Sequence, residues 1–376
     1  MGRSLLVPAA LCLLACVAAC KEPPKAQPTP SEVPALSAPT VPSASPAAID
    51  PPANRIVLIA GGDIDLSRRT GQRILRDSSL DPLASLRPLT SPADVRFANL
   101  ESQLCDLGGS TGSPTNPLIF AGPPQGAEVL QRGLIDVVST ANNHSWDYGL
   151  RCLSETLTNL DRVGVQHAGT DPSGRDPHQS VIVRRNGRSL AIFASTLSFN
   201  DGPLPQHLAS KYVAYGDIGA IGRRIAAVRS EVDWVMVSLH WGDEYTDVPT
   251  QAHRAGMRAA VDAGADVVVG HHPHTPQRVE WHRGRPIVFS PGNLVFHENS
   301  NHPWTGWGYL ARITLDKEVS AGVELCPYHL VDASAQRLGD VEERAFFAHW
   351  DRISIGPGVA RRGERTEDGC TRLLAP

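Results

Sequence analysis

The sequence predicts an α/β fold with a mixed sheet or a pair of sheets. Beyond residue 54, short apolar runs alternate with polar loops and with stretches of helical spacing. The apolar runs are rich in Val and Ile and lack strict polar alternation, which is typical of strands covered on both faces. Asn186-Gly187 is a turn dipeptide between two apolar runs and predicts a hairpin over 180–196.

Six apolar runs are predicted strands that end in loops rich in Asp, Glu, Asn, Ser or His. They cover 55–66, 93–102, 134–149, 232–245, 265–274 and 285–296. Helices are expected over 153–164, 220–232 and 251–264. In open α/β sheets, ligands bind beyond the carboxyl ends of the strands. One polar loop indicates only solvent exposure, but six loops with the same residue types predict a shared site.

The composition excludes some classes of function. The chain has 376 residues, of which 41% are hydrophobic and 20% charged, and its formal net charge is −4. These values are typical of a globular protein that has no general attraction to nucleic acid or to an anionic surface. A basic stripe with interleaved aromatic residues is also missing, so the sequence predicts no nucleic-acid partner.

The N-terminal region is predicted to be a targeting segment. In residues 1–19, Arg3 precedes an apolar run that is too short for a membrane span, as in a secretory signal peptide. The run ends in VAAC, which resembles the lipobox of bacterial lipoproteins and predicts lipidation of Cys20. Cleavage before Cys16, or a secreted protein cut near Ala19, is the alternative. Cys20 would anchor the chain outside the cytoplasmic membrane, in the bacterial cell envelope.

The segment 20–53 is expected to be a disordered tether. It contains ten prolines among Ala, Ser, Thr and Lys, and cannot bury enough apolar surface to fold. Four cysteines lie beyond it, namely Cys105, Cys152, Cys326 and Cys370. In an exported protein they predict one or two disulfides, with three possible connectivities.

The loop GHHPHTPQ, residues 270–277, predicts part of a metal site. His272 and His274 can both reach one centre if the chain is no longer extended at Pro273. The other candidate ligands are Asp63, Glu101, Asn143 and His240. Imidazole, carboxylate and amide oxygen together favour one or two ions of Mn, Fe or Zn over a calcium cage. With two ions about 3.5–4 Å apart, a carboxylate would bridge them and water would be activated between them.

Other residues have predicted supporting roles and structural alternatives. His144 is the candidate general acid, and Asp147 is the carboxylate expected to orient it. His271 is expected to support the site, whereas His297 and His302 either line it or, as we expect, lie at the surface. Taken alone, His240 is more typical of a core histidine, Asp63 of a turn or helix cap, and Glu101 and Asp147 of solvated residues. The remaining histidines are interpreted as surface or packing residues: His167, His178, His253, His282, His329 and His349.

Six motifs in order resemble the CapA family of bacterial poly-γ-glutamate capsule biosynthesis proteins, which is related to calcineurin-like metallophosphoesterases. The motifs are GDIDLSRR (62–69), FANLES (97–102), ANNHSWDYG (141–149), HWGDEY (240–245), GHHPHTPQ (270–277) and SPGNLVF (290–296). The resemblance covers roughly 55–315. It implies a four-layer αββα sandwich of the metallophosphoesterase type over 54–315, with a metal site at one edge. Residues 316–376 would add strands, a closing helix over 344–356 and a flexible tail after Gly358.

The motifs match the phosphoesterase pattern unevenly. Asn143-His144, His240 and His272-Pro273-His274 match its third, fourth and fifth motifs. The first motif, Asp-x-His, is Asp63 and Asp65 here, and Asp65 would either add a ligand or face solvent. The second motif, Gly-Asp, is replaced by Asn99-Leu100-Glu101, so Glu101 would substitute for the bridging aspartate. Residues expected to face substrate or to support the ligands are Asp65, Asn99, Asn142, Glu244, Tyr245, His271, Ser290 and Asn293.

Two hypotheses for the function follow. The first is a metal-dependent hydrolase that acts on a phosphoester, amide or anionic-polymer linkage during capsule or envelope-polymer assembly. The second is a non-catalytic partner that binds a nascent anionic polymer, or a membrane synthase complex, and serves export. The altered second motif favours the second hypothesis, because a weakened metal site can retain binding and lose turnover.

Overall fold

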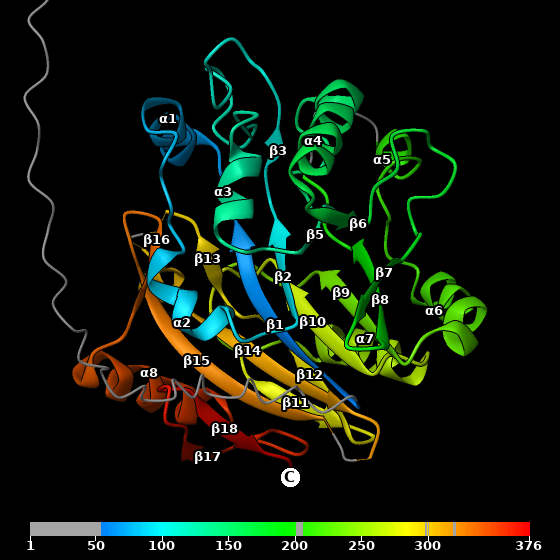
Figure 1. The fold of residues 1–376 in the computed structure, drawn as a ribbon, viewed down its shortest axis with the longest axis vertical. Coiled ribbons are helices and arrows are strands. Elements are labelled where there is room, and N and C mark those ends of the chain that lie inside the picture. The colour runs from blue at the N-terminus through cyan, green and yellow to red at the C-terminus, as the bar shows by residue number, and fades with distance from the viewer. Residues whose placement is uncertain (1–53, 201–205, 298, 300, 319–320) are drawn as a thin grey trace, which may run out of the picture. The chain divides into compact units, whose positions relative to one another are not determined.

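The computed structural model describes residues 54–200, 206–297, 299, 301–318 and 321–376, so the predicted signal peptide, Cys20 and the tether lie outside the described residues. Residues Asp50–Pro376 form one compact unit. Two large β-sheets and two helical layers build this unit (Figure 1). Among the described residues, no helix combines the length and the apolar character needed to cross a membrane.

The first sheet is centred on β1 (Arg55–Ile64). This strand pairs in parallel with β2 (Val95–Leu100) and antiparallel with β14 (Trp307–Asp316). The strand order is β17-β18-β15-β14-β1-β2-β5-β6, with β13 beside β1 and β16 beside β15. The other strands are β5 (Val137–Ser139), β6 (Gln166–Ala168), β13 (Asn293–Val295), β15 (Gly322–Val331), β16 (Ser334–Arg337), β17 (Arg361–Arg365) and β18 (Thr371–Leu374).

The second sheet has the order β11-β12-β10-β9-β8-β7, and its four central strands run parallel. The predicted hairpin is confirmed, because Asn186 and Gly187 have φ angles of 53° and 73° and connect β7 to β8. The strands are β7 (Val181–Arg185), β8 (Arg188–Thr196), β9 (Trp234–His240), β10 (Val267–His271), β11 (Val279–His282) and β12 (Arg285–Val288). A short separate ladder joins β3 (Gln103–Leu104) to β4 (Ala121–Gly122).

The four predicted helices correspond to α4, α6, α7 and α8, whereas α1, α2, α3 and α5 were not predicted. The long helix α4 ends at Val163, where Gly164 takes the left-handed conformation that stops it. The helices are α1 (Arg68–Arg76), α2 (Arg87–Thr90), α3 (Gly126–Arg132), α4 (Gly149–Val163), α5 (Gln206–Ala209), α6 (Ile218–Val228), α7 (Gln251–Asp262) and α8 (Asp340–Ile353). Short 3₁₀ turns are η1 (Ala84–Leu86), η2 (Arg229–Glu231) and η3 (Pro303–Gly306).

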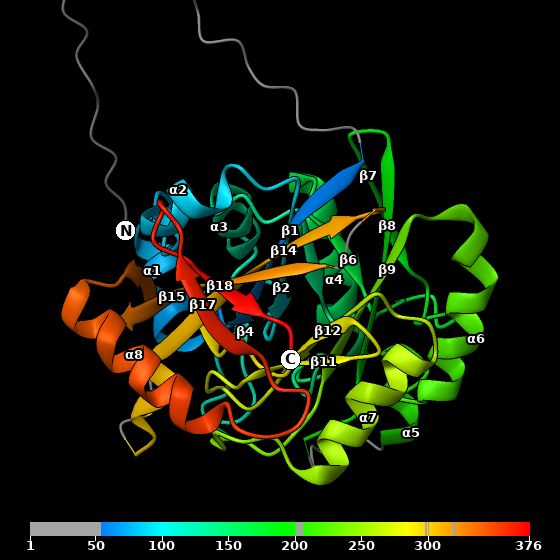
Figure 2. The ribbon, with the colours of Figure 1, turned by 90° about the horizontal axis from the view of Figure 1, so that it is seen from below.

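Three apolar layers hold these elements together. Between the sheets, Leu58 and Phe97 of the first sheet pack in one cluster with Met236 and Val269 of the second. A second cluster joins the first sheet to α1, α3 and α4, and a third joins the second sheet to α6 and α7. Figure 2 shows α6 and α7 on the side of the second sheet that faces away from β1. The order helix, sheet, sheet, helix confirms the predicted four-layer αββα sandwich.

The C-terminal segment belongs to the first sheet. Strand β15 pairs with β14, and α8 packs Phe346, Phe347 and Trp350 into the cluster between the sheets. The closing helix is therefore present. The flexible tail expected after Gly358 is wrong, because this part of the chain forms β17 and β18, and β18 pairs with β15.

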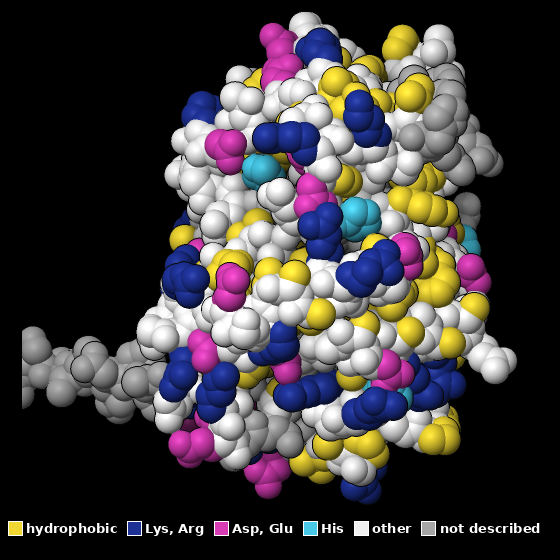
Figure 3. Space-filling view, turned by 90° about the vertical axis from the view of Figure 1, so that its right-hand side faces the viewer, with side chains coloured by type: hydrophobic (Ala, Val, Ile, Leu, Met, Phe, Trp, Pro, Cys, Tyr) yellow, Lys and Arg dark blue, Asp and Glu magenta, His cyan; other side chains and the backbone are white. Residues whose placement is uncertain are grey.

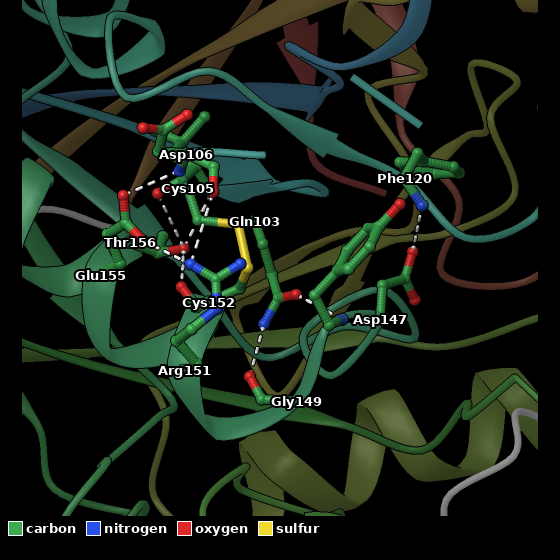
Figure 4. Close-up of a disulfide and its surroundings, with 12 residues drawn as sticks. Gln103, Cys105, Asp106, Phe120, Asp147, Gly149, Arg151, Cys152, Glu155 and Thr156 are labelled. Carbon is green, nitrogen blue, oxygen red and sulfur yellow. Dashed lines mark hydrogen bonds and ion pairs between the residues drawn. A yellow bond between two sulfur atoms is a disulfide. The ribbon is translucent and has the colours of Figure 1, made fainter. Parts of the chain in front are cut away.

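Two disulfides are present, within the predicted one or two, and the structure gives their pairing. Cys105 is bonded to Cys152, and Cys326 to Cys370. The first joins the segment after β3 to α4, as Figure 4 shows, and the second joins β15 to the residue before β18. Each bridge thus ties two parts of the chain that are more than forty residues apart.

Candidate metal centre

The predicted site loops converge at one edge of the two sheets. Asp63 lies near the end of β1, Glu101 directly after β2, and His240 and His271 end β9 and β10. The facing parallel strands bring these ends together, as the sequence predicts. Asp63, Glu101 and His240 have no measurable exposure to solvent. The alternative that Glu101 is a solvated surface residue is therefore wrong.

Two groups of side chains present ligand atoms that all lie within 4.8 Å of one another. One group is Glu101, His272 and His274, and the other is Asp63, Glu101 and His240. Glu101 belongs to both groups. It therefore occupies the place expected of a bridging carboxylate. Although a glutamate replaces the expected aspartate, a carboxylate is still present at this position.

Two of the candidate ligand atoms lack the hydrogen-bond partners that buried polar atoms usually have. Glu101 Oε1 lies 3.7 Å from His240 Nε2 and 3.6 Å from His274 Nε2, and it accepts no hydrogen bond from the described residues. His272 Nδ1 is also buried without a partner. Such atoms are costly unless something satisfies them. A divalent cation would do so, and the mixture of nitrogen and oxygen donors fits Mn, Fe or Zn.

The backbone of the histidine loop is strained. His272 and His274 have φ angles of 97° and 59°, in the left-handed region that non-glycine residues rarely adopt. Each such residue costs of order 1–3 kcal/mol, and strain of this kind gathers at functional sites. The two turns around Pro273 interrupt the alternation of an extended strand. They allow both imidazoles to face Glu101, as predicted.

Asparagines hold the candidate ligands in place. Asn293 Oδ1 lies 2.9 Å from His274 Nδ1, which leaves Nε2 of that ring turned toward Glu101. The Asn99 amide donates to Asp63 Oδ1 at 2.9 Å and contacts His240 Nδ1 at 3.2 Å. Asn142 in turn donates to Asn99 Oδ1 at 3.1 Å. Outer partners of this type fix the orientation of metal ligands.

The remaining predicted residues near the ligands are also in contact with them. Asn143 Oδ1 lies 2.8 Å from His240 Nε2, so both candidate ligand atoms face the same point. His271 Nδ1 lies 3.2 Å from Asp63 Oδ1, but neither ring nitrogen of His271 makes a well-directed hydrogen bond. His271 therefore stands behind Asp63, in the supporting position predicted for it.

Burial and charge set the protonation of the site. Burial alone would raise the pKa of Asp63, but contacts with His271 and His274 hold it well below its usual value. Burial raises the pKa of the Glu101 carboxyl well above its usual range. Burial alone would lower the pKa of His274, but Glu101 and Asp63 raise it to about 10. Before a cation binds, His274 thus carries the positive charge that offsets the buried carboxylates.

The other two imidazoles behave in the opposite way. Burial, together with the neighbouring His272 imidazole, which would repel a second positive charge, lowers the pKa of His240 well below its usual value. Burial and the charge of His274 lower the pKa of His272 to about 3. Both rings are therefore neutral at physiological pH, which is the form that binds a metal.

His144, the candidate general acid, and Asp147, the carboxylate expected to orient it, are in direct contact. His144 Nδ1 lies 3.0 Å from Asp147 Oδ2, and the carboxylate also accepts from Phe120 N at 2.9 Å, which Figure 4 shows. Asp147 is buried as well as bonded, so the solvated alternative for it is wrong. No motif pointed to Asn200, which accepts a hydrogen bond from Asn143 Nδ2 and contacts the His144 ring.

Asp65 is neither a ligand nor exposed to solvent. It is buried, accepts hydrogen bonds from Ser67 and binds Arg68 at 2.6 Å. Ser290 does not face a substrate, because it is buried and its hydroxyl accepts from Gly292 N at 3.1 Å. The sequence assigned no role to Arg68, which lines a cavity beside the ligands.

This cavity has a volume of about 440 Å³ and opens onto His274 and Asn293. Tyr245 and His297 also line it, so the expectation that His297 is only a surface residue is wrong. His302 stacks on Tyr245 with ring centroids 4.4 Å apart. Glu244 is exposed beside them.

Two glycines of the motifs allow the backbone to come close at the site. A Cβ atom at Gly62 would lie 1.8 Å from the carbonyl oxygen of Gly292, and Gly292 itself has a φ of 81°. Asp63 N donates to that carbonyl at 3.0 Å. These glycines are required by close packing of the strand ends and carry no chemistry of their own.

Comparisons with known proteins agree with the motif series. The model of a family described as "Bacterial capsule synthesis protein PGA_cap" matches residues 57–298. The "PGA biosynthesis protein CapA" of Bacillus subtilis is 32% identical over 220 residues, which cover 56% of this chain and 55% of that protein. The "Capsule biosynthesis protein CapA" of Bacillus anthracis is 31% identical over 177 residues, covering 45% and 41%. The chain thus spans about half the length of the curated relatives it matches.

A more distant relative is described as a "Probable polyglutamine synthesis accessory protein" of Mycobacterium tuberculosis, 26% identical over 213 residues, which cover 54% of this chain and 55% of that protein. A solved structure described as a putative 5'-nucleotidase from Staphylococcus aureus has a TM-score of 0.46 and 15% identity, covering 80% of this chain and 59% of that one. A TM-score and identity this low carry no inference about activity.

Proposed function

The chain belongs to the family of bacterial capsule synthesis proteins, and from that premise we propose that it is a metal-dependent hydrolase of capsule or envelope-polymer assembly. Its substrate would contain a phosphoester, amide or other linkage of an anionic polymer such as poly-γ-glutamate. The observation that carries this proposal is Glu101, a buried carboxylate common to two groups of candidate ligands, with one oxygen that accepts no hydrogen bond from the described residues.

The candidate ligands would hold one or two divalent ions of Mn, Fe or Zn. They are Asp63, Glu101, Asn143, His240, His272 and His274. The chemistry supplied by such ions is the polarisation of a phosphoryl or carbonyl oxygen and the activation of water near neutral pH.

The chain's own residues supply proton transfer and orientation. His144 Nδ1–H donates to Asp147 Oδ2, so Nε2 of His144 is the atom that would exchange a proton with the leaving group. Asn293 keeps His274 Nε2 turned inward, and the web of Asn99 and Asn142 fixes Asp63. The buried setting limits the access of bulk water and strengthens these interactions.

The proposal is tested by metal content and turnover. The purified protein should contain about one or two equivalents of Mn, Fe or Zn, or take them up when added. It should hydrolyse a generic phosphodiester or a γ-glutamyl polymer, and His144→Ala should abolish that turnover while metal content stays unchanged. A protein that contains no metal and takes up none would contradict the proposal.

We further propose that Cys20 carries a lipid that anchors the protein outside the cytoplasmic membrane. This rests on the sequence alone, on the small residues before Cys20 and the charged residues after it. Cys20→Ala should move the protein from the membrane fraction to the soluble extracytoplasmic fraction and should prevent labelling by a radioactive fatty acid. A variant that keeps its label would assign the lipid to Cys16 or another site.

A second candidate function is that of a non-catalytic partner of a membrane synthase complex or of a nascent polymer. The observation that favours it is that some candidate ligands already have protein partners, as in the contacts of Asp63 with Asn99 and of His240 with Asn143. Binding of metal or of polyglutamate without turnover, unchanged in His144→Ala, would favour this function over hydrolysis.

A further inference from the structure

The cavity beside the candidate ligands has a basic lining. The described residues around it include Arg68, Arg69, His274 and His297, and none of those that line it is an acid. Acids adjoin this lining from outside: Asp65 binds Arg68 at 2.6 Å, Asp332 binds Arg69 at 3.2 Å, and Glu244 contacts Tyr245. The cavity is therefore suited to a negatively charged group, although the net charge of the whole chain is negative.

Arg68 is held in a fixed position in this wall. Asp65 accepts from both Nε and Nη2 of Arg68, at 3.2 and 2.6 Å, and the guanidinium carbon lies 4.0 Å above the centre of the Phe120 ring. Asp65 is 1% exposed, whereas the Arg68 side chain is 37% exposed. The buried partner thus fixes the guanidinium from behind and leaves part of it open to a ligand. Asp65 occupies two of its five N–H groups, and among the described residues the other three have no hydrogen-bond acceptor.

The backbone at Arg68 is strained, which gives a second and independent observation. Its φ angle is 46°, in the region that favours glycine. The strain is maintained because Arg68 N donates to Thr111 O and Arg68 O accepts from Thr111 Oγ1, both at 2.8 Å. A glycine would adopt this turn at lower cost. The position therefore serves to present the guanidinium, since strained residues of this kind cluster at ligand sites.

We propose that Arg68 binds an oxyanion of the substrate in this cavity and positions the adjoining bond at the candidate metal centre. Asp65, the second acidic residue of the first motif, orients Arg68. It would therefore affect substrate binding only through this arginine. The flat ring of Tyr245, stacked on His302, forms another wall of the same cavity. A guanidinium recognises both carboxylate and phosphate in a bidentate manner, so the ligand chemistry is that of an oxyanion. This inference rests on the proposed function and names the residue that selects its substrate.

The test measures the binding of two probes by isothermal titration calorimetry with the full chain loaded with Mn²⁺. Inorganic phosphate represents a phosphoester and glutarate represents a polymer carboxylate. Arg68→Gln should weaken the binding of the preferred probe by about tenfold to a hundredfold, the range expected for a lost charge-assisted hydrogen bond. Arg223→Gln, which removes the same charge from a 74% exposed side chain on α6, should leave the affinity unchanged.

Arg68→Lys is the control for misfolding, because it keeps a positive charge opposite the buried Asp65. It should unfold at the same temperature as the wild type and still bind the probe several-fold more weakly, since one ammonium cannot serve both Asp65 and a ligand. Tighter binding of phosphate assigns the cavity to a phosphoester, and tighter binding of glutarate assigns it to a carboxylate polymer. Equal affinity in the wild type and both Arg68 variants, or no binding of either probe, would overturn the proposal.

Metal content measured on the same samples separates this inference from the proposed function. If the wild type takes up no metal, the metal centre fails, but the dependence on Arg68 is still measurable with the metal-free chain. If metal is bound and the Arg68 variants bind both probes normally, the cavity assignment fails and the metal centre stands.

Discussion

Glu101 Oε1 lies 3.6 Å from His274 Nε2, too far for a hydrogen bond and close enough for both atoms to hold one cation. The same oxygen lies 3.7 Å from His240 Nε2 on the other side. Glu101 thus stands between the imidazole at the end of β9 and one in the loop that follows β10. Because the glutamate side chain is longer than that of aspartate, Glu101 can reach the position between both groups of candidate ligands.

Glu101→Gln should remove metal binding from both ligand groups. The amide keeps the size of the side chain and loses the charge, so we expect metal affinity to fall by more than about a hundredfold, beyond the effect typical of outer residues. His240→Asn is the matched variant, because His240 belongs to only one group, and it should leave about one equivalent bound. Equilibrium dialysis with elemental analysis measures both. Equal metal loss in the two variants would argue against a shared carboxylate.

His144→Ala should reduce kcat by about 10²–10⁴ without changing metal content, as is typical for a lost general acid. Asp147→Asn should have a smaller effect, because it leaves the imidazole present but no longer fixes its tautomer. The check is a comparison of kcat and its pH profile in the wild type and the two variants. If Asp147→Asn loses metal in proportion to activity, the pair supports the fold of the site and does not transfer protons.

The metal-free protein should lose stability as pH rises from about 6.5 to 10. The pKa of His274 in the folded protein is about 10, raised by Glu101 and Asp63, against about 6.5 in the unfolded chain. Its contribution is therefore fully present below pH 6.5 and is lost as pH rises through 10. Urea unfolding at pH 6, 8 and 10 tests this, with His274→Asn expected to flatten the dependence. A constant free energy of unfolding across this range would contradict it.

Acid should destabilise the metal-free protein through two other histidines. Burial lowers the pKa of His253 to about 4, and burial together with the charge of His274 lowers that of His272 to about 3. A group with a depressed pKa contributes stability above the unfolded value, which is lost as pH falls from 6.5 toward these values. In the same urea unfolding experiment, His253→Asn should reduce the loss of unfolding free energy as pH falls below 6.5. The loss at alkaline pH should stay unchanged.

The two disulfides should differ in their effect on turnover but not on stability. They close chain segments of 47 and 44 residues, so replacing either pair by serine should cost about 2–4 kcal/mol. Only Cys105–Cys152 lies beside Gln103, whose amide donates to Ser145 O and Gly149 O around the acid–base loop (Figure 4). Loss of this bridge should therefore also lower kcat. Equal kcat in both double variants at a temperature where each is folded would contradict this.

The sequence could predict the layers of the fold and the meeting of the loops. Runs such as that ending at Asp63 are apolar on both faces, so they must be covered on both sides, and their parallel ends must share an edge. The proline between His272 and His274 predicted that the chain is not extended there. It did not predict the positive φ angles of the two histidines. The apolar runs and helical spacing predicted an α/β fold, whereas the four-layer sandwich was implied by the resemblance of the six motifs to a known family.

The sequence could not predict contacts that depend on tertiary neighbours. Arg361–Arg365 has no apolar alternation, so its sequence does not predict a strand. It forms β17 because it pairs with β18. Asp65 is an acid beside a predicted ligand, and only the turn at Arg68 shows that it binds the arginine. Disulfide pairing depends in the same way on which strands become neighbours.

Figure 3 shows acidic and basic side chains interspersed over one face, which is consistent with the mixed charge of the chain.

The most direct test of the account is anomalous X-ray scattering from crystals of the protein grown with Mn²⁺ or Zn²⁺, recorded above and below the absorption edge. The account predicts one or two anomalous peaks among Asp63, Glu101, His240, His272 and His274, with Glu101 as a ligand of each. Crystals that show no anomalous peak at this position, from protein that also takes up no metal in solution, would contradict the central claim.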